Sequence, residues 1–317
     1  MRIAILGATS VIAKDFILTT ASNSGRVGFV TEFPLEVYLF SRRPVETEQF
    51  LASYGVSKGH FAADYCDLFD CPPFDVILNF VGAGDPARVN DLGPAIFEVT
   101  QHYDDLALRY LKKNPTCRYI FMSSGAVYGD SFDLPVSENS ISRFPVNELI
   151  PQYRYGLAKF HAECRHRSFA DLPIFDVRIF NYFSASVPID SQFFLSTAVR
   201  AIIDRTCLEV DHYNIVRDYI GPVDFCRLLF CLIYSGKQNG AFDCVSLSPV
   251  YKFDLLEELR QAFGLSYSVL VTSRIEPPTG FKLNYFSTDR RIEKFGFSST
   301  TTSLDLIRSG VEEILAK

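Results

Sequence analysis

Two side chains that could exchange a proton are spaced one helical turn apart: Tyr155 and Lys159 begin and end the segment Tyr-Gly-Leu-Ala-Lys. Residues i and i+4 lie on the same face of a helix, so the ammonium of Lys159 would lie near the phenol of Tyr155. A nearby cation favours the ionised form of a phenol, whose pKa is otherwise about 10. Ser124, just after the apolar segment 118–122, would hydrogen-bond to the same substrate oxygen. The trio predicts general acid/base catalysis at a hydroxyl or carbonyl group.

The N-terminus has the pattern of a strand followed by a phosphate-binding turn. Residues 2–6 are a short apolar run typical of a buried parallel strand. A glycine-containing turn then leads into a helical stretch to about residue 20, and a helix N-terminus favours an anion. Only the first glycine of the usual G-x-x-G-x-x-G pattern is present, with Ser10 and Ala13 at the other two positions. We expect a dinucleotide to be bound here by Gly7, Thr9, Ser10, Val11 and Ile12.

The end of the second predicted strand bears on the choice of dinucleotide. Residues 35–40 are followed by Ser41, Arg42 and Arg43, with no carboxylate among them. An acidic residue at this place accepts a hydrogen bond from the ribose 2′-hydroxyl of NAD, whereas arginine suits the 2′-phosphate of NADP. The segment therefore favours NADP(H), and NAD(H) stays open because two arginines also suit a solvated loop.

A third predicted strand, residues 75–80, leads into Val81 and Gly82. Small residues at the end of a parallel strand leave room for a ligand at that edge of the sheet, so we add Val81 and Gly82 to the expected cofactor site.

Alternating strand and helix patterns run from residue 1 to about residue 169, and they include a helical stretch over 95–113. Such alternation predicts an α/β fold with a Rossmann-like doubly wound parallel sheet. A further strand at 174–180 completes a dinucleotide-binding domain of residues 1–180.

The remainder of the chain is expected to form a smaller C-terminal substrate-binding lobe, residues 181–212 and 235–317. Between these segments, at about 213–234, the chain is expected to return to the dinucleotide-binding domain. Helical patterns cover residues 253–263 and 303–315.

Composition excludes several classes of protein. The chain has 317 residues and a formal net charge of -6, which argues against a general nucleic-acid binder. We see no apolar run of the ~18 residues that cross a bilayer and no targeting segment before the first strand, so the cytoplasm is the expected compartment. The eight cysteines form no C-x-x-C pair and are expected to be reduced. His161, Cys164 and His166 lack a fourth ligand, so no metal site is expected.

Five further motifs follow one another along the chain. They are A-D-Y-C-D at 63–67, S-S-G-A-V-Y-G at 123–129, Y-x-x-x-K at 155–159, R-I-F-N at 178–181 and R-D-Y-I-G-P-V-D at 217–224. With these motifs the chain resembles the extended short-chain dehydrogenase/reductase family of nucleotide-sugar epimerases, dehydratases and reductases, whose patterns are G-D-x-x-D, S-S-x-x-V-Y-G, Y-x-x-x-K, R-x-F-N and R-D-Y-I-H-V-x-D. The resemblance extends over nearly the whole chain.

The resemblance implies roles for particular residues. Ser124, Tyr155 and Lys159 would be the catalytic trio, with Lys159 also binding the nicotinamide ribose. Asp64, with its neighbour Tyr65, would meet the adenine. Substrate-binding residues would be Ser124, Asn181 and Arg217, the last two at the nucleotide diphosphate, with Arg274 as a further phosphate ligand that no motif anchors. Without the resemblance, Asn181 and Arg217 are better explained as a buried amide and an arginine in an ion pair with Asp218.

Departures from the family pattern narrow the reaction. The family's 4,6-dehydratases carry Asp and Glu directly after the catalytic hydroxyl, where this chain has Gly125 and Ala126. A dehydratase is therefore not expected. Because the arginines after the second predicted strand favour NADP, we expect NADP-dependent reduction of a nucleotide-linked keto-sugar, at C4 on the family pattern, with a 4-epimerase that retains NAD(P) as the alternative. A non-catalytic dinucleotide-binding sensor or scaffold is a second alternative, and its relatives commonly lose the Tyr or the Lys. The family often pairs through two helices of each subunit, so a homodimer is compatible with the resemblance.

Overall fold

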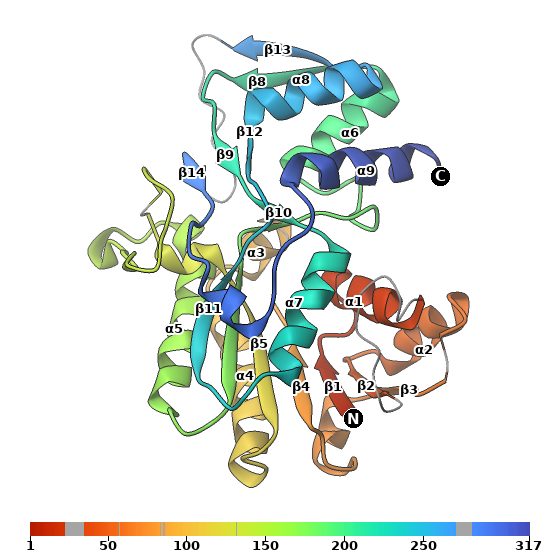
Figure 1. The fold of residues 1–317 in the computed structure, drawn as a ribbon, viewed down its shortest axis with the longest axis vertical. Coiled ribbons are helices and arrows are strands. Elements are labelled where there is room, and N and C mark those ends of the chain that lie inside the picture. The colour runs from red at the N-terminus through yellow and green to blue at the C-terminus, as the bar shows by residue number, and fades with distance from the viewer. Residues whose placement is uncertain (23–34, 57, 83, 85, 131, 271–280) are drawn as a thin grey trace.

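The computed structural model describes residues 1–22, 35–56, 58–82, 84, 86–130, 132–270 and 281–317. In these residues seven parallel strands form a central sheet in the order β11-β6-β5-β4-β1-β2-β3 (Figure 1). Their bounds are β1 Arg2–Leu6, β2 Glu36–Phe40, β3 His60–Ala63, β4 Val76–Asn79, β5 Arg118–Ser124, β6 Ile174–Ile179 and β11 Gly240–Cys244. The order reverses between β1 and β4, which opens a crevice at the carboxyl ends of these two strands.

Alternation along each strand supplies both faces of the sheet with apolar side chains. Ile3 and Ile5 of β1 enter one core cluster, and Ala4 and Leu6 enter the cluster on the opposite face. The first face is covered by α1 (Val11–Ser22), α2 (Pro44–Ser53) and α7 (Pro222–Tyr234), and the second by α4 (Ala95–Lys113) and α5 (Arg154–Ser168). Figure 1 shows α7 beside α1 and α5 beside α4. A sheet buried on both faces explains its near-continuous apolar strands.

A smaller lobe surrounds a third core cluster above the carboxyl edge of the sheet (Figure 1). Its helices are α6 Phe194–Asp204, α8 Lys252–Phe263 and α9 Ser303–Leu315. Short strands pair as β10 with β7, as β12-β9-β14, and as β13 with β8. These strands are β7 Asn181–Tyr182, β8 Cys207–Asp211, β9 Val216–Arg217, β10 Tyr219–Ile220, β12 Val250–Tyr251, β13 Ser266–Leu270 and β14 Asn284–Tyr285.

The connecting segments contain one further short helix, α3 (Pro86–Leu92), and several 3-10 turns. The turns are η1 Tyr65–Phe69, η2 Gly125–Tyr128, η3 Val146–Glu148, η4 Pro151–Tyr153 and η5 Arg291–Phe295. None of the helices in the described part of the chain has the length and apolar character needed to span a membrane.

The predicted α/β fold with a doubly wound parallel sheet is confirmed, and α4 and α9 begin and end at the predicted residues. The domain bounds need one correction. Residues 235–317 were assigned to the smaller lobe, whereas Gly240–Cys244 pairs with β6 as the edge strand of the central sheet. Ile292 and Phe297 also join the first core cluster of the sheet. The sequence did not predict this strand because Asp243 interrupts the apolar pattern of a buried strand. The buried Asp243 carboxylate accepts hydrogen bonds from Tyr128 and Ser287.

Candidate active site

Ser124 and Tyr155 are brought together where β5 ends and α5 begins. Ser124 is the last residue of β5 and caps η2, because its Oγ accepts a hydrogen bond of 3.2 Å from the Ala126 N–H. Tyr155 lies in the first turn of α5, close enough to the Ser124 hydroxyl for that hydroxyl to lower the pKa of the Tyr155 phenol. The predicted acid/base residue and its predicted partner are therefore neighbours at the carboxyl edge of the sheet.

Lys159 lies beneath this pair, at the same edge of the sheet. Its side chain is buried, and its Nζ donates to the Met122 carbonyl at 2.8 Å and to the Val81 carbonyl at 3.4 Å. The ammonium also lies 4.2 Å from the centroid of the Phe121 ring. Burial lowers the pKa of Lys159 to about 8, with nearby carboxylates acting in the opposite sense. A Cβ at position 82 would come within 3.2 Å of Nζ, so glycine there gives the ammonium its space.

The protonation of Tyr155 differs from the sequence expectation. We expected Lys159 to favour the ionised phenol, but burial raises the pKa of Tyr155 and the hydrogen bond to Ser124 only partly opposes it. The physical reason is that the Lys159 ammonium is engaged with two backbone carbonyls of the sheet. In this structure Tyr155 is therefore a neutral phenol, ready to donate a proton.

The turn after β1 fits a dinucleotide. Gly7 has φ +81°, and a Cβ on it would lie 2.8 Å from the Val81 nitrogen, so only glycine lets β1 and β4 approach so closely. Ser10 caps the start of α1, because its Oγ accepts from the Ala13 N–H at 3.3 Å. Thr9, Ser10, Val11 and Ile12 are all partly exposed along this turn. The N-terminus of α1 thus faces the crevice where the strand order reverses.

Asp64 and Tyr65, both expected at the adenine, have different local roles. Asp64 caps η1 through a hydrogen bond from the Cys66 N–H at 3.1 Å. The Tyr65 hydroxyl accepts from the Gly7 N–H at 3.0 Å, so this side chain supports the phosphate-binding turn itself.

Of the three residues at the end of β2, Ser41 is buried and both arginines are exposed, but only Arg43 has an ionic partner. Ser41 is buried, lies 2.9 Å from the Thr47 hydroxyl and accepts from the Arg43 N–H at 3.2 Å. Arg43 forms an ion pair with Glu46 at 2.9 Å. Arg42 is exposed, and none of the carboxylates in the described residues forms an ion pair with it. Arg42 is therefore the better placed of the two arginines to bind a phosphate.

The predicted substrate residues lie above the catalytic pair. Asn181 donates to the Asp218 carbonyl at 2.9 Å. Arg217 donates through Nη1 to the Val216 and Lys282 carbonyls, each at 2.8 Å, and burial lowers its pKa. The alternative ion pair with Asp218 is not formed, because that carboxylate accepts instead from Ser246 and Ser303. Arg274 lies outside the described residues.

A family comparison decides the classification. The model of the NAD dependent epimerase/dehydratase family matches residues 60–244, which include the predicted catalytic trio, Asn181 and Arg217. The chain belongs to this family. It is therefore an NAD(P)-dependent enzyme, in agreement with the resemblance that the motifs carry.

Individual proteins of known function show what this epimerase/dehydratase family member is similar to. It is 29% identical over 135 residues to a UDP-glucose 4-epimerase of Mycoplasma pneumoniae, and the aligned part spans 38% of this chain and 38% of that protein. A UDP-glucose 4-epimerase of Bifidobacterium longum, solved with NAD+ and UDP, is 18% identical, with a TM-score of 0.74 over 100% of this chain and 99% of that one.

A second solved structure has a similar fold. It is a UDP-glucuronic acid 4-epimerase of Bacillus cereus in complex with UDP-glucuronic acid and NAD, 16% identical, with a TM-score of 0.77 over 100% of this chain and 99% of that one. At these identities the structural matches establish the shared fold of the family member.

Two residues near the site were missed from the sequence. Tyr285 lies with its hydroxyl 3.3 Å from Ser124 Oγ, and its ring lies 5.8 Å from the Arg217 guanidinium. The Lys282 ammonium lies 5.2 Å from the same ring, and burial lowers its pKa to about 8, with the charge of Arg217 acting in the same sense. Both belong to a short strand and the segment before it, which no motif of the family marks. Only the pairing of β14 with β9 places them beside Arg217.

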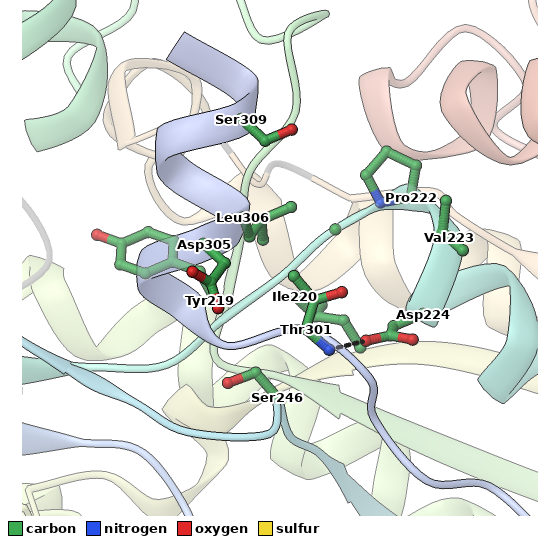
Figure 2. A pocket seen from close by; sticks show the side chains of 11 residues that line it. Tyr219, Ile220, Pro222, Val223, Asp224, Ser246, Thr301, Asp305, Leu306 and Ser309 are labelled. Carbon is green, nitrogen blue, oxygen red and sulfur yellow. Dashed lines mark hydrogen bonds between the residues drawn. The ribbon is translucent and has the colours of Figure 1, made fainter. Parts of the chain in front are cut away.

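A cavity of about 190 Å³ lies away from the catalytic pair, between α7 and α9 (Figure 2). Figure 2 shows Asp224 at its wall, accepting a hydrogen bond from the Thr301 N–H, which is 3.1 Å long. The same carboxylate accepts from Thr300 and pairs with Arg227, so it holds the segment before α9 in place. None of the predicted site residues lines this cavity, and the described part of this family member contains no cluster of metal-ligand side chains.

Proposed function

We propose that this protein reduces a nucleotide-linked keto-sugar, with NADPH as the reductant. A bound nicotinamide dinucleotide would supply the hydride. Tyr155 would give its proton to the carbonyl oxygen, and Ser124 would hold that oxygen by a second hydrogen bond. The arrangement that carries the proposal is the placing of Ser124, at the end of β5, next to Tyr155 in the first turn of α5, with Lys159 buried at the same sheet edge.

The preference for NADPH rests on Arg42. This arginine is exposed and without an ionic partner in the described residues, while its neighbour Arg43 is paired with Glu46. A guanidinium binds phosphate through two parallel hydrogen bonds, which suits the 2′-phosphate. A net reductase must also exchange its oxidised cofactor for a reduced one in every cycle.

Recognition of the substrate is assigned to Arg217, with Lys282 beside it. Arg217 is held by two backbone carbonyls, which fixes the plane of its guanidinium before a ligand arrives. Two cations close together attract a diphosphate, and their common neighbour Tyr285 reaches the catalytic Ser124. A nucleotide diphosphate bound here would place the attached sugar toward Tyr155.

Dehydration is disfavoured by the space around position 125. The family's dehydratases need an acidic side chain directly after the catalytic hydroxyl. Here a Cβ at Gly125 would lie 2.5 Å from the Phe180 ring. Phe180 packs against Tyr128 and Tyr285, so it cannot move without disturbing the cluster.

Epimerisation at C4 is the second candidate, and the comparisons favour it. The relatives described above are 4-epimerases, and two of their structures contain NAD. The same three residues would serve, because epimerisation removes a hydride from C4 and a proton from the C4 hydroxyl and then returns both. The two reactions differ in whether reduced cofactor is consumed.

The purified protein distinguishes these reactions in one experiment. NADPH and NADH oxidation is followed with a panel of nucleotide-linked 4-keto-6-deoxysugars, and UDP-glucose is incubated separately to detect its C4 epimer. Stoichiometric oxidation of NADPH with a keto-sugar supports the reductase. Epimer formation without net oxidation, together with NAD released on denaturation, would replace it by the epimerase.

A further inference from the structure

Tyr285 joins the smaller lobe to the catalytic hydroxyl. It lies in β14, which is 161 residues from Ser124 in the chain, and its Oη is 3.3 Å from Ser124 Oγ. Both side chains are buried, with exposed fractions of 9% for Tyr285 and 5% for Ser124. Buried hydroxyl groups this close must satisfy one another, because water has little access to them.

The hydrogen-bonding capacity of Ser124 gives this contact a direction. A serine hydroxyl has one proton and two acceptor lone pairs. The Ala126 N–H occupies one lone pair of Ser124 Oγ at 3.2 Å. By geometry alone, either oxygen of the Ser124–Tyr285 contact could be the donor. The proposed reaction uses the single proton of Ser124 for the substrate oxygen, so the Tyr285 O–H is the donor that fills the second lone pair of Ser124.

With both lone pairs filled, the proton of Ser124 has one place to point. It is directed at the side of the site where Tyr155 lies, and at a substrate oxygen that enters between the two residues. We propose that Tyr285 is a positioning residue that fixes the Ser124 hydroxyl as a hydrogen-bond donor for the reaction, an inference that rests on the proposed function.

The surroundings of Tyr285 hold its ring in one orientation. The ring lies 4.9 Å from that of Phe132 and 5.1 Å from that of Phe180, centroid to centroid. The charged groups that face it are Arg217, its register partner on β9, and Lys282. Both are cations and both lie over the ring, so the hydroxyl end is left to Ser124 and Tyr155.

The positioning has a consequence for Tyr155. A hydrogen bond donated by Ser124 favours the ionised phenol, and this bond already opposes the effect of burial on the pKa of Tyr155. Without the Tyr285 hydroxyl, Ser124 can rotate and donate elsewhere. The pKa of Tyr155 should then rise, although Tyr285 does not touch the substrate oxygen.

Tyr285→Phe tests the inference in the full-length protein with cofactor bound, because it removes one oxygen and keeps the ring. We expect kcat to fall by about tenfold, KM for the nucleotide sugar to stay within about twofold, and the pH limb that reports Tyr155 to move up by about half to one pH unit. Tyr110→Phe is the matched control. It removes another buried hydroxyl, one that accepts from Phe74 on the far side of the sheet, and should change none of these quantities. Wild-type kcat and an unmoved pH limb in Tyr285→Phe would overturn the inference.

A readout without substrate separates this inference from the proposed function. The protein is labelled with ¹³C at the tyrosine Cζ and saturated with NADPH. The Tyr155 resonance is identified as the one that is missing from the spectrum of Tyr155→Phe, and its chemical shift reports the ionisation of Tyr155. Its titration should move to higher pH in Tyr285→Phe and stay in place in Tyr110→Phe. An unmoved titration in Tyr285→Phe would reject the positioning role. Failure of the wild type to turn over any nucleotide sugar would count against the proposed function alone.

Discussion

At the scale of single residues, the site contains groups whose neutral forms are favoured by burial. The pKa of Tyr155 is raised, and the pKa of Lys159 is lowered to about 8. Desolvation dominates both shifts: Lys159 is buried and Tyr155 is partly buried at the sheet edge. The raised pKa keeps the Tyr155 phenol protonated at neutral pH, which is the form that a proton donor needs before transfer.

Arg42 carries a residue-scale prediction about the cofactor. Arg42→Ala should weaken NADPH binding by about tenfold or more and leave NADH binding unchanged, because only the 2′-phosphate contact is lost. Arg43→Ala is the matched control, since Arg43 is already paired with Glu46, and it should change neither affinity appreciably. Fluorescence titration with both dinucleotides measures these affinities. An equal loss for NADPH and NADH in Arg42→Ala would refute the assignment.

At the scale of elements, the β1–α1 turn tests how much the close approach of two strands matters. Gly7→Ala places a Cβ 2.8 Å from the Val81 nitrogen at φ +81°, whereas Gly296 has the same φ with no described atom within 4 Å of such a Cβ. Gly296→Ala should cost about 1 kcal/mol for the left-handed backbone alone. Gly7→Ala should cost about 3 kcal/mol and weaken dinucleotide binding. Urea unfolding measures the free energy of unfolding of both variants. An equal loss in the two would show that a Cβ at position 7 does not clash with Val81.

A buried ionic cluster joins α4, α5 and β6. His166 is fully buried, with Nε2 2.7 Å from Asp104 and Nδ1 2.6 Å from Asp176. Desolvation alone would lower the pKa of His166, but the two carboxylates outweigh it and raise the pKa to about 9. The cluster therefore stabilises the fold by an ion pair that the unfolded chain, with an ordinary histidine, lacks.

The sign of this effect with pH is definite. Because the folded pKa exceeds the unfolded value of about 6.5, the stabilisation is complete below pH 6.5 and is lost as pH rises through about 9. Lys159 and Lys282, with pKa values lowered to about 8, act in the opposite sense as pH rises. The difference in unfolding free energy between wild type and His166→Gln isolates the histidine. It should be a few kcal/mol at pH 6 and shrink toward pH 9.5, and a pH-independent difference would disprove the charged state.

Elements with a clear hydrophobic periodicity could be predicted from the sequence. Elements whose place depends on residues far away in the chain could not. α4 and α9 have strong helical periodicity over 13 or more residues and match their predicted bounds. β11 has a buried carboxylate and an N-terminal glycine, so its place in the sheet is set by Tyr128, Ser287 and the pairing with β6. Likewise Ser124 and Tyr155 lie in local motifs, whereas Tyr285 joins them only through the fold.

At the scale of the whole molecule, the two lobes contribute different parts of the site. The sheet domain provides Ser124, Tyr155 and Lys159, and the β12-β9-β14 sheet provides Arg217 and Tyr285. In the proposed function Arg217 binds the substrate and Tyr155 is the acid. Mutation should then separate substrate binding from chemistry, because the two residues lie on different lobes.

Arg217→Ala tests this separation. Loss of a buried guanidinium at the diphosphate should raise KM for the nucleotide sugar by about ten- to a hundredfold, while kcat changes by less than about threefold. NADPH affinity should not change. Arg260→Ala, at an exposed arginine of α8 paired with Glu257, is the matched control and should behave as wild type. Steady-state kinetics decides the matter, and an unchanged KM in Arg217→Ala would return Arg217 to a purely structural role.

The central claim is that the phenol of Tyr155 transfers the proton that accompanies hydride transfer, and single-turnover kinetics of Tyr155→Phe tests it most directly. The variant is loaded with NADPH and mixed with the keto-sugar that the wild type reduces, and nicotinamide absorbance is followed. Reduction should slow by at least about a hundredfold, with unchanged NADPH affinity and an unfolding midpoint close to that of the wild type. A rate within a few-fold of the wild type would show that another group supplies the proton and that this site has been misassigned.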